Sequence, residues 1–371
     1  MGYLRGLCLS GYRFLRDGLL PSALLTIHGR DALRNLYPDR QSPRKYPTIF
    51  LAFFYFLNFL YSYLFSFLFS FLFSFLFFLF ATPVYADQLI IEPDMGRKPV
   101  LDAISNSKYS LDLVIYGFTD NTLLDAIVQK KMEGKTVKII MESSPYKSSQ
   151  ENTRAIAAFN KNNIAWQGEI KPFNLIHQKT LLIDDKKAIV MTFNFTRATF
   201  RNERNFALVL DDAERVKAIA GIFSADWNHV ASHIDSADLI VSPDNSRAKL
   251  LELMHHAKSS LRVYAQTLND YKIIGALANA ARRDVMVEII LSQPLRKKQE
   301  KYLQKAGVRL HYSQELIIHA KVLIVDDKEA VLGSINLTHT SLDKNRELSV
   351  ITRDMDVIAQ LNEVFKKDWQ G

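Results

Sequence analysis

The stretch HQKTLLID, residues 177–184, decides the fold, because it returns as HAKVLIVD at residues 319–326. In each copy a lysine stands two residues after a histidine, and an aspartate follows after four further residues. The pair Asp226-Trp227 recurs as Asp368-Trp369, and the offset between these two pairs equals the offset between the two histidines. Similarity at a fixed offset indicates an internal repeat, so the chain contains two copies of one structural unit.

The order of elements within each copy predicts the fold class. Ser110-Leu111 matches Ser260-Leu261 at a slightly larger offset, so the first copy carries about eight extra residues before its HQK motif. Apolar runs typical of strands alternate with helical stripes in both copies. We therefore predict an α/β fold of two tandem α-β-α half-domains, residues 87–235 and 236–371. The Asp-Trp pairs are expected to close a terminal helix by core packing.

A hydrophobic segment precedes the repeats. Residues 46–86 contain no charged side chain and centre on FSFLFSFLFSFLFFLF. A helix needs only about 20 apolar residues to cross a bilayer, so this segment is long enough. It reads either as an export signal cleaved after Val84-Tyr85-Ala86 or as an uncleaved membrane anchor. In both cases the basic leader, residues 1–45, stays in the cytoplasm and residues 87–371 are exported, to be secreted, periplasmic or anchored.

The net charge of +8 is concentrated in the leader. Residues 1–86 carry 8 Lys and Arg against 3 Asp and Glu, whereas residues 87–371 carry 39 against 36, a balance of +3. Binding to a nucleic-acid backbone usually requires a clear basic surface, which this balance does not suggest. The only cysteine is Cys8, so the repeats hold no disulfide, no thiolate metal site and no cysteine nucleophile.

The HQK and HAK motifs place basic side chains together. Residues two apart on an extended strand face the same side, so each histidine shares a pocket with its lysine. The aspartate would close the strand, and a hairpin would bring Asn194 or Asn336 beside the pair. Lysine and asparagine can stabilise phosphoryl oxygens, and histidine can attack phosphorus or carry a proton. This scheme requires no metal and no cofactor.

The two motifs, HQK-x4-D and HAK-x4-D followed by GSIN (residues 333–336), resemble the HKD motifs of the phospholipase D superfamily over residues 90–371. The resemblance implies a pseudo-dimer in which both motifs form one active site. It implies that His177 forms a phosphohistidine while His319 protonates the leaving alcohol. It also implies a phospholipid or other phosphodiester substrate at a membrane surface, with no obligate protein partner.

The candidate residues follow from the repeat. The expected catalytic residues are His177, Lys179, Asp184, Glu203, His319, Lys321, Asp326 and Glu347. The expected phosphate-binding residues are Lys179, Thr192, Asn194, Lys321, Ser334 and Asn336. Glu203 and Glu347 follow their histidines at nearly the same distance along the chain and are the candidates to fix the imidazole tautomers. Asp184 and Asp326 either act directly or hold the hairpin. The first copy has Met191-Thr192 where the second has Gly-Ser, which keeps a hydroxyl but adds bulk.

Four functions fit these residues. The first hypothesis is a phospholipase D-type phosphodiesterase that hydrolyses phospholipid headgroups. The alternatives within the superfamily are an exported nuclease and a phosphatidyltransferase such as a cardiolipin synthase-like enzyme. The fourth is a catalytically silent, membrane-tethered binding module. The two intact His-Lys pairs argue against it.

Overall fold

The computed structural model describes residues 47–79, 86–143, 145, 150–234 and 236–371. Two compact units are present, residues 1–82 and residues 83–371. In the first, helix α1 (Pro47–Leu79) contains the stretch Ile49–Leu72, which is long and apolar enough to cross a membrane and whose side chains are exposed. The basic leader and residues Val84 and Tyr85 of the expected cleavage site lie outside the described residues.

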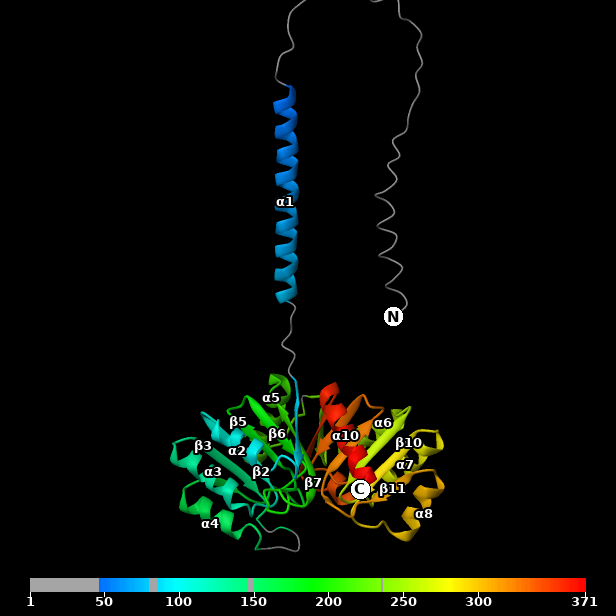
Figure 1. Cartoon of the computed structure of the whole chain (residues 1–371). Coiled ribbons are helices and arrows are strands. Elements are labelled where there is room, and N and C mark those ends of the chain that lie inside the picture. The colour runs from blue at the N-terminus through cyan, green and yellow to red at the C-terminus, as the bar shows by residue number, and fades with distance from the viewer. Residues whose placement is uncertain (1–46, 80–85, 144, 146–149, 235) are drawn as a thin grey trace, which may run out of the picture. The chain divides into compact units, whose positions relative to one another are not determined.

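Residues 83–371 form an α/β unit with two sheets of the same strand order, which confirms the predicted fold class (Figure 1). The first sheet has the order β4-β3-β2-β5-β6-β7-β1, and the second has the order β11-β10-β9-β13-β14-β15-β8. The strands of the first are β1 (Gln88–Glu92), β2 (Ser110–Ile115), β3 (Thr136–Met141), β4 (Ala165–Gln167), β5 (Thr180–Ile183), β6 (Lys187–Met191) and β7 (Glu203–Leu210). Those of the second are β8 (Leu239–Ser242), β9 (Ser260–Ala265), β10 (Met286–Leu291), β11 (Arg309–Tyr312), β13 (Lys321–Val325), β14 (Glu329–Gly333) and β15 (Glu347–Thr352). A short strand of the second repeat, β12 (Ile317–Ile318), pairs with β7 of the first.

The helices cover the sheets in two groups. The outer helices are α2 (Lys98–Ser105), α3 (Asn121–Met132), α4 (Thr153–Lys161), α6 (Ser246–His256), α7 (Tyr271–Arg282), α8 (Lys297–Lys305) and α9 (His339–Asp343). The first residues of α3 and α7 follow from the sequence, because the side chains of Asp120 and Asp270 accept hydrogen bonds from backbone N–H groups of the first helical turn. Asn163 and Gly307 adopt the left-handed conformation expected of their residue types after α4 and α8. The remaining helices, α5 (Ala213–Trp227) and α10 (Met355–Gln370), pack in a central core that both repeats share.

Two buried arginines tie the repeats together in a reciprocal pattern. Arg204 on β7 donates to Asp368 on α10 at 2.7 Å and 3.0 Å. Arg346, directly before β15, donates to Asp226 on α5 at 2.8 Å. Both guanidinium groups are almost completely buried, and each ion pair joins one repeat to the other. The tryptophans of the two Asp-Trp pairs pack against the central core, as predicted, and the aspartates in addition join the two repeats by ion pairs. A charged carboxylate stays in the core because an arginine neutralises it.

A buried glutamate on β1 makes the stability depend on pH. Glu92 is fully buried, and burial raises its pKa to about 8, with Asp94 adding to the rise and Arg97 opposing it. Between the ordinary value of 4.5 and about 8, the folded form keeps a proton that the unfolded chain releases. The contribution of Glu92 to the free energy of unfolding should therefore fall as the pH rises through this window, by about 5 kcal/mol in total.

The substitution Glu92→Gln removes this titration, so the stability of the variant should fall less with rising pH over that window than the stability of the wild type. Thermal unfolding of the full chain in detergent from pH 5 to pH 9 measures the difference. The exposed Glu363 on α10 supplies the control, because Glu363→Gln should leave the wild-type pH slope unchanged. Equal slopes for wild type and Glu92→Gln would contradict the assignment.

Candidate active site

The backbone of each candidate histidine is held by the opposite repeat. The N–H groups of His177 and Gln178 both donate to the carbonyl of Arg346, each at 3.0 Å. The N–H groups of His319 and Ala320 donate to the carbonyl of Arg204, at 3.2 Å and 2.9 Å. The prediction that both histidines lie on strands is wrong, because β5 and β13 begin only after them, at Thr180 and Lys321. The histidines lie just before these strands, where the two repeats meet.

The side chain of His177 pairs with a carboxylate of the second repeat. Its Nδ1 lies 2.8 Å from Oε2 of the fully buried Glu347. The other oxygen of Glu347 accepts hydrogen bonds from Ser341 at 2.5 Å and from Asn345 at 3.1 Å. Burial alone would raise the pKa of Glu347, but His177 and Lys179 outweigh it and lower the pKa. Since an ionised carboxylate only accepts, Nδ1 of His177 carries the proton and Nε2 is the free nitrogen.

The side chain of His319 pairs with an amide of the first repeat. Its Nδ1 lies 3.0 Å from Oδ1 of Asn205. The amide is oriented by Glu203, which accepts from Nδ2 of Asn205 at 3.1 Å, and by Thr192, which donates to Oδ1 at 2.8 Å. Nζ of Lys321 also lies 3.2 Å from Nδ1 of His319. Because Oδ1 of Asn205 only accepts, and because Lys321 already donates to two backbone carbonyls, we assign the proton of neutral His319 to Nδ1, which leaves Nε2 without a proton.

Asn205 is the functional residue that the sequence reasoning missed. Glu203 does not contact a histidine, so its assignment as the counterpart of Glu347 is corrected. The offset that relates His177 to His319 also relates Asn205 to Glu347 and Glu203 to Asn345. The repeat offset therefore pointed to Asn205, but an acidic residue was expected at this position and Asn205 is an amide. The site is thus asymmetric, with a charged partner on His177 and a neutral partner on His319.

The two lysines complete a crowded group of basic side chains. Lys179 is fully buried, donates to the carbonyl of His177 at 2.6 Å, and lies 5.3 Å from the centre of the Tyr116 ring. Lys321 donates to the carbonyls of Thr192, at 3.0 Å, and of His319. Both lysines and both histidines come from positions that the sequence predicted, and the structure brings all four together.

Burial lowers the pKa of all four groups, and repulsion by neighbouring cations adds to this for every one of them except Lys179. Burial lowers the pKa of Lys179 to about 7, with Glu347 opposing the shift. It lowers the pKa of Lys321 well below its usual range, and the charge of Lys179 adds to this. The pKa of His177 is lowered by burial against the opposing charge of Glu347, whereas that of His319 is lowered further, by burial and by both lysines. A bound anion would raise the pKa of every one of these groups, so the cluster is built to receive negative charge.

The expected phosphate-binding residues divide into two pairs. Oδ1 of Asn194 accepts from the N–H of Gly117 at 3.2 Å, and the N–H of Asn336 donates to Ser341 at 2.8 Å. The hydroxyls have another role. Thr192 accepts from the N–H of Phe206 at 2.9 Å, and Ser334 accepts from the equivalent N–H of Leu348 at 3.1 Å. Both hydroxyls are fully buried between neighbouring strands, so their assignment to phosphate binding is corrected.

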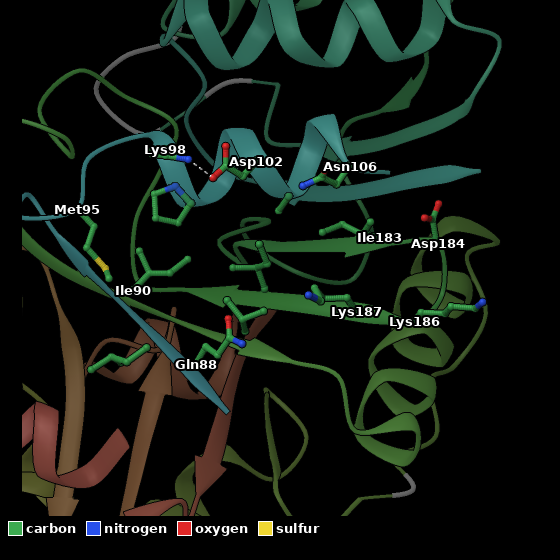
Figure 2. Close-up of a pocket in the computed structure, with 15 residues that line it drawn as sticks. Gln88, Ile90, Met95, Lys98, Asp102, Asn106, Ile183, Asp184, Lys186 and Lys187 are labelled. Carbon is green, nitrogen blue, oxygen red and sulfur yellow. Dashed lines mark hydrogen bonds and ion pairs between the residues drawn. The ribbon is translucent and has the colours of Figure 1, made fainter. Parts of the chain in front are cut away.

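Asp184 and Asp326 lie away from the histidines. Asp184 accepts from the N–H groups of residues 108–110, and Asp326 accepts from those of residues 258–260. Both adopt positive φ at the tight turn after their strand, roughly 20 Å of extended chain beyond the histidine. The assignment of these aspartates to catalysis is corrected, because their carboxylates fix the hairpins. Figure 2 shows Asp184 at the edge of a pocket of about 700 Å³ that neither histidine lines.

The arrangement can perform phosphoryl chemistry with the side chains of this chain. One imidazole has a free Nε2 and a carboxylate that stabilises positive charge on the ring, which suits a nucleophile. The other has a free Nε2 and a neutral partner, which suits a proton carrier. The lysines are placed to neutralise phosphoryl oxygens. No group of three or more metal-ligating side chains is found within the described part of the chain.

Comparison with known proteins agrees with this geometry. The family model described as "Cardiolipin synthase, PLD-like domain" matches residues 100–227 and 250–369, one match in each repeat. A cardiolipin synthase of Clostridium perfringens is 25% identical over 323 residues, which covers 72% of this chain and 67% of that protein. The mitochondrial cardiolipin hydrolase of Mus musculus is 29% identical over 131 residues, or 34% of this chain and 59% of that protein.

A solved structure shares the fold at low sequence identity. The phosphatidylserine synthase of Haemophilus influenzae Rd KW20 superposes with a TM-score of 0.56 over 76% of this chain and 86% of that chain, at 13% identity. At this identity the likeness establishes the fold alone. The family match and the superposition both span the two repeats.

Proposed function

This chain belongs to the phospholipase D superfamily, and on that premise we propose that it is a phosphatidyltransferase of the cardiolipin synthase type. The proposal rests on the crossed hydrogen bonds of the site, from His177 to Glu347 and from His319 to Asn205. Each repeat supplies one histidine and orients the histidine of the other. One substrate phosphoryl group can then be served by both imidazoles.

The reaction has two steps. Nε2 of His177 attacks phosphorus, the bond to the headgroup oxygen breaks, and that oxygen takes the proton from Nε2 of protonated His319. In the second step a hydroxyl oxygen attacks phosphorus, its proton passes to His319, and the electron pair of the N–P bond returns to His177. Glu347 stabilises the positive ring of the phosphohistidine. Lys179 and Lys321 neutralise the non-bridging oxygens.

The acceptor in the second step decides between transfer and hydrolysis. The similarity to cardiolipin synthases over most of both repeats supports an alcohol acceptor. Hydrolysis, in which water accepts the phosphatidyl group, is the second candidate, and the similarity to a cardiolipin hydrolase favours it over 34% of this chain. The small balance of +3 in residues 87–371 supports a lipid rather than a nucleic-acid substrate.

The helix α1 supports a membrane location for this chemistry. We propose that α1 anchors the protein and that residues 87–371 lie outside the cytoplasm, because basic residues precede the apolar segment. Protease added to spheroplasts should then degrade residues 87–371. Full protection in intact spheroplasts would contradict this orientation.

A product analysis tests the function. We expect the full chain, purified in detergent and mixed with phosphatidylglycerol vesicles, to convert two lipids into cardiolipin and free glycerol. Mass spectrometry of the lipids separates this outcome from phosphatidic acid, the product of hydrolysis. Plasmid nicking is measured in parallel. Nicking without any lipid product would overturn the proposal, and phosphatidic acid as the only lipid product would replace transfer with hydrolysis.

A further inference from the structure

One carboxylate of the first repeat lies beside the site without being part of either histidine pair. Oε1 of Glu151 lies 2.9 Å from the position that a Cβ atom on Gly117 would take, and Cγ of Asn194 lies 3.4 Å from the same position. Glu151 and Lys179 are close enough for their charges to interact. Glu151 therefore packs over the backbone of Gly117, next to the asparagine and the lysine of the first repeat.

The neighbouring residue fixes this position. Asn152 is fully buried, and its Oδ1 accepts from the N–H of Phe118 at 2.8 Å. Its Nδ2 donates to the carbonyls of Tyr116, at 2.8 Å, and Glu142, at 2.7 Å. Two of these three hydrogen bonds join Asn152 to the residues on either side of Gly117, and the third joins it to the residue that follows β3. The backbone of Glu151 is held at the site by this attachment.

The second repeat has no equivalent carboxylate. Helix α4 begins two residues after Glu151, and its counterpart α8 begins two residues after Leu295. The acid therefore stands where the other repeat has an apolar side chain. Within the described residues, no hydrogen bond or ion pair occupies the carboxylate of Glu151, and its side chain is partly exposed.

The charge of Glu151 excludes a phosphate-binding role, because a carboxylate repels phosphoryl oxygens. A hydroxyl group is the partner that fits, since it donates a hydrogen bond without adding a second positive charge next to Lys179. We propose that Glu151 binds a hydroxyl of the acceptor alcohol, an inference that rests on the proposed function. A polyol such as glycerol is then preferred to a monohydric alcohol.

The acceptor step then uses two neighbouring hydroxyls. One oxygen attacks phosphorus, its proton passes to Nε2 of His319, and the N–P bond to His177 breaks with its electron pair returning to the imidazole. The adjacent hydroxyl donates a hydrogen bond to Glu151 and keeps its proton. Glu151 therefore changes which alcohol is chosen and leaves the chemistry of the two histidines unaltered.

Competition between two alcohols tests this selection. The full chain in detergent receives phosphatidylglycerol with equal concentrations of deuterated glycerol and 1-propanol, and mass spectrometry gives the ratio of deuterated phosphatidylglycerol to phosphatidylpropanol. Both products come from one covalent intermediate, so the ratio does not depend on the amount of active protein. Glu151→Ala should lower the ratio about tenfold, the effect of losing one hydrogen bond to a charged group.

Two further variants control the measurement. Glu151→Gln keeps the size of the side chain and should lower the ratio less than Glu151→Ala. Asp125→Ala removes an exposed acid on α3 and should leave the ratio at its wild-type value. An unchanged ratio in both Glu151 variants, with both products still formed, would overturn this inference and leave the proposed transfer intact.

An ethanolamine arm separates hydroxyl from ammonium recognition. If Glu151→Ala lowers transfer to ethanolamine more than transfer to glycerol, both relative to 1-propanol, the carboxylate recognises a cation and the inference is wrong. Phosphatidic acid as the sole wild-type product would overturn it too, because water then takes the place of the alcohol. Absence of any lipid turnover by the wild type would reject the proposed function and this inference with it.

Discussion

Alanine in place of His177 is expected to lower phosphodiester turnover at least about a thousandfold, because the covalent step then lacks its nucleophile. His319→Ala should cause a comparable loss with phosphatidylglycerol, whose alkoxide leaving group needs a proton. Initial rates of glycerol release from vesicles measure both. The exposed His256 on α6 provides the control, since His256→Ala should retain wild-type activity.

A substrate with a better leaving group separates the two roles. 4-Nitrophenolate leaves without a proton, so a 4-nitrophenyl phosphodiester should still phosphorylate the His319→Ala variant. A burst of about one equivalent of nitrophenolate is then expected, followed by slow release. His177→Ala should give no burst. The opposite pattern, with a burst in His177→Ala alone, would show that the roles of the two histidines are exchanged.

The second large effect is expected for Glu347→Gln, which should reduce kcat/KM about a hundredfold or more. The amide keeps a hydrogen-bond acceptor for Nδ1 of His177 but no longer neutralises the positive ring of the phosphohistidine. Loss of this charge also lowers the pKa of His177, because Glu347 holds that pKa up against burial. Since His177 must be neutral to attack, the limb of the pH profile that reports His177 should move to lower pH.

The corresponding variant for His319 is Asn205→Asp, which changes the partner of its Nδ1. A carboxylate at this position would raise the pKa of His319, which in wild type is lowered by burial and by the lysines. His319 must be protonated in the first step, so the limb of the profile that reports His319 should move to higher pH. A pH profile of kcat/KM for both variants measures the two limbs. Parallel movement of both limbs in either variant would contradict the separate assignments.

The repeat made much of the fold predictable from the sequence. The repetition of HxK-x4-D in both copies identified the two His-Lys pairs, and alternating strand and helix patterns predicted the α/β class. The same offset relates Asn205 to Glu347, but the preference for an acidic residue directed attention to Glu203. A neutral amide can orient an imidazole through its oxygen, and residue type alone does not indicate this.

Other features depend on contacts that no local pattern contains. The carboxylate of Asp184 could serve catalysis or a turn, and only its bonds to the backbone of residues 108–110 decide for the turn. The position of Glu151 depends on the three hydrogen bonds of Asn152, two of them to segments far away in sequence. Arg204 and Asp368 are 164 residues apart, and their contact exists only because the repeats pack against each other.

The reciprocal ion pairs also limit how the two repeats can diverge. A change at Arg204 leaves the charge of Asp368 uncompensated in the core, and a change at Arg346 does the same to Asp226. Each repeat therefore restricts which residues the other can carry at these two ion pairs, and a substitution of one partner is tolerated only together with a matching substitution of the other. The outer loops are not restricted by ion pairs of this kind. Glu151 could arise in one repeat without a counterpart, so new acceptor preferences can evolve on one side of a site whose centre remains tied to both.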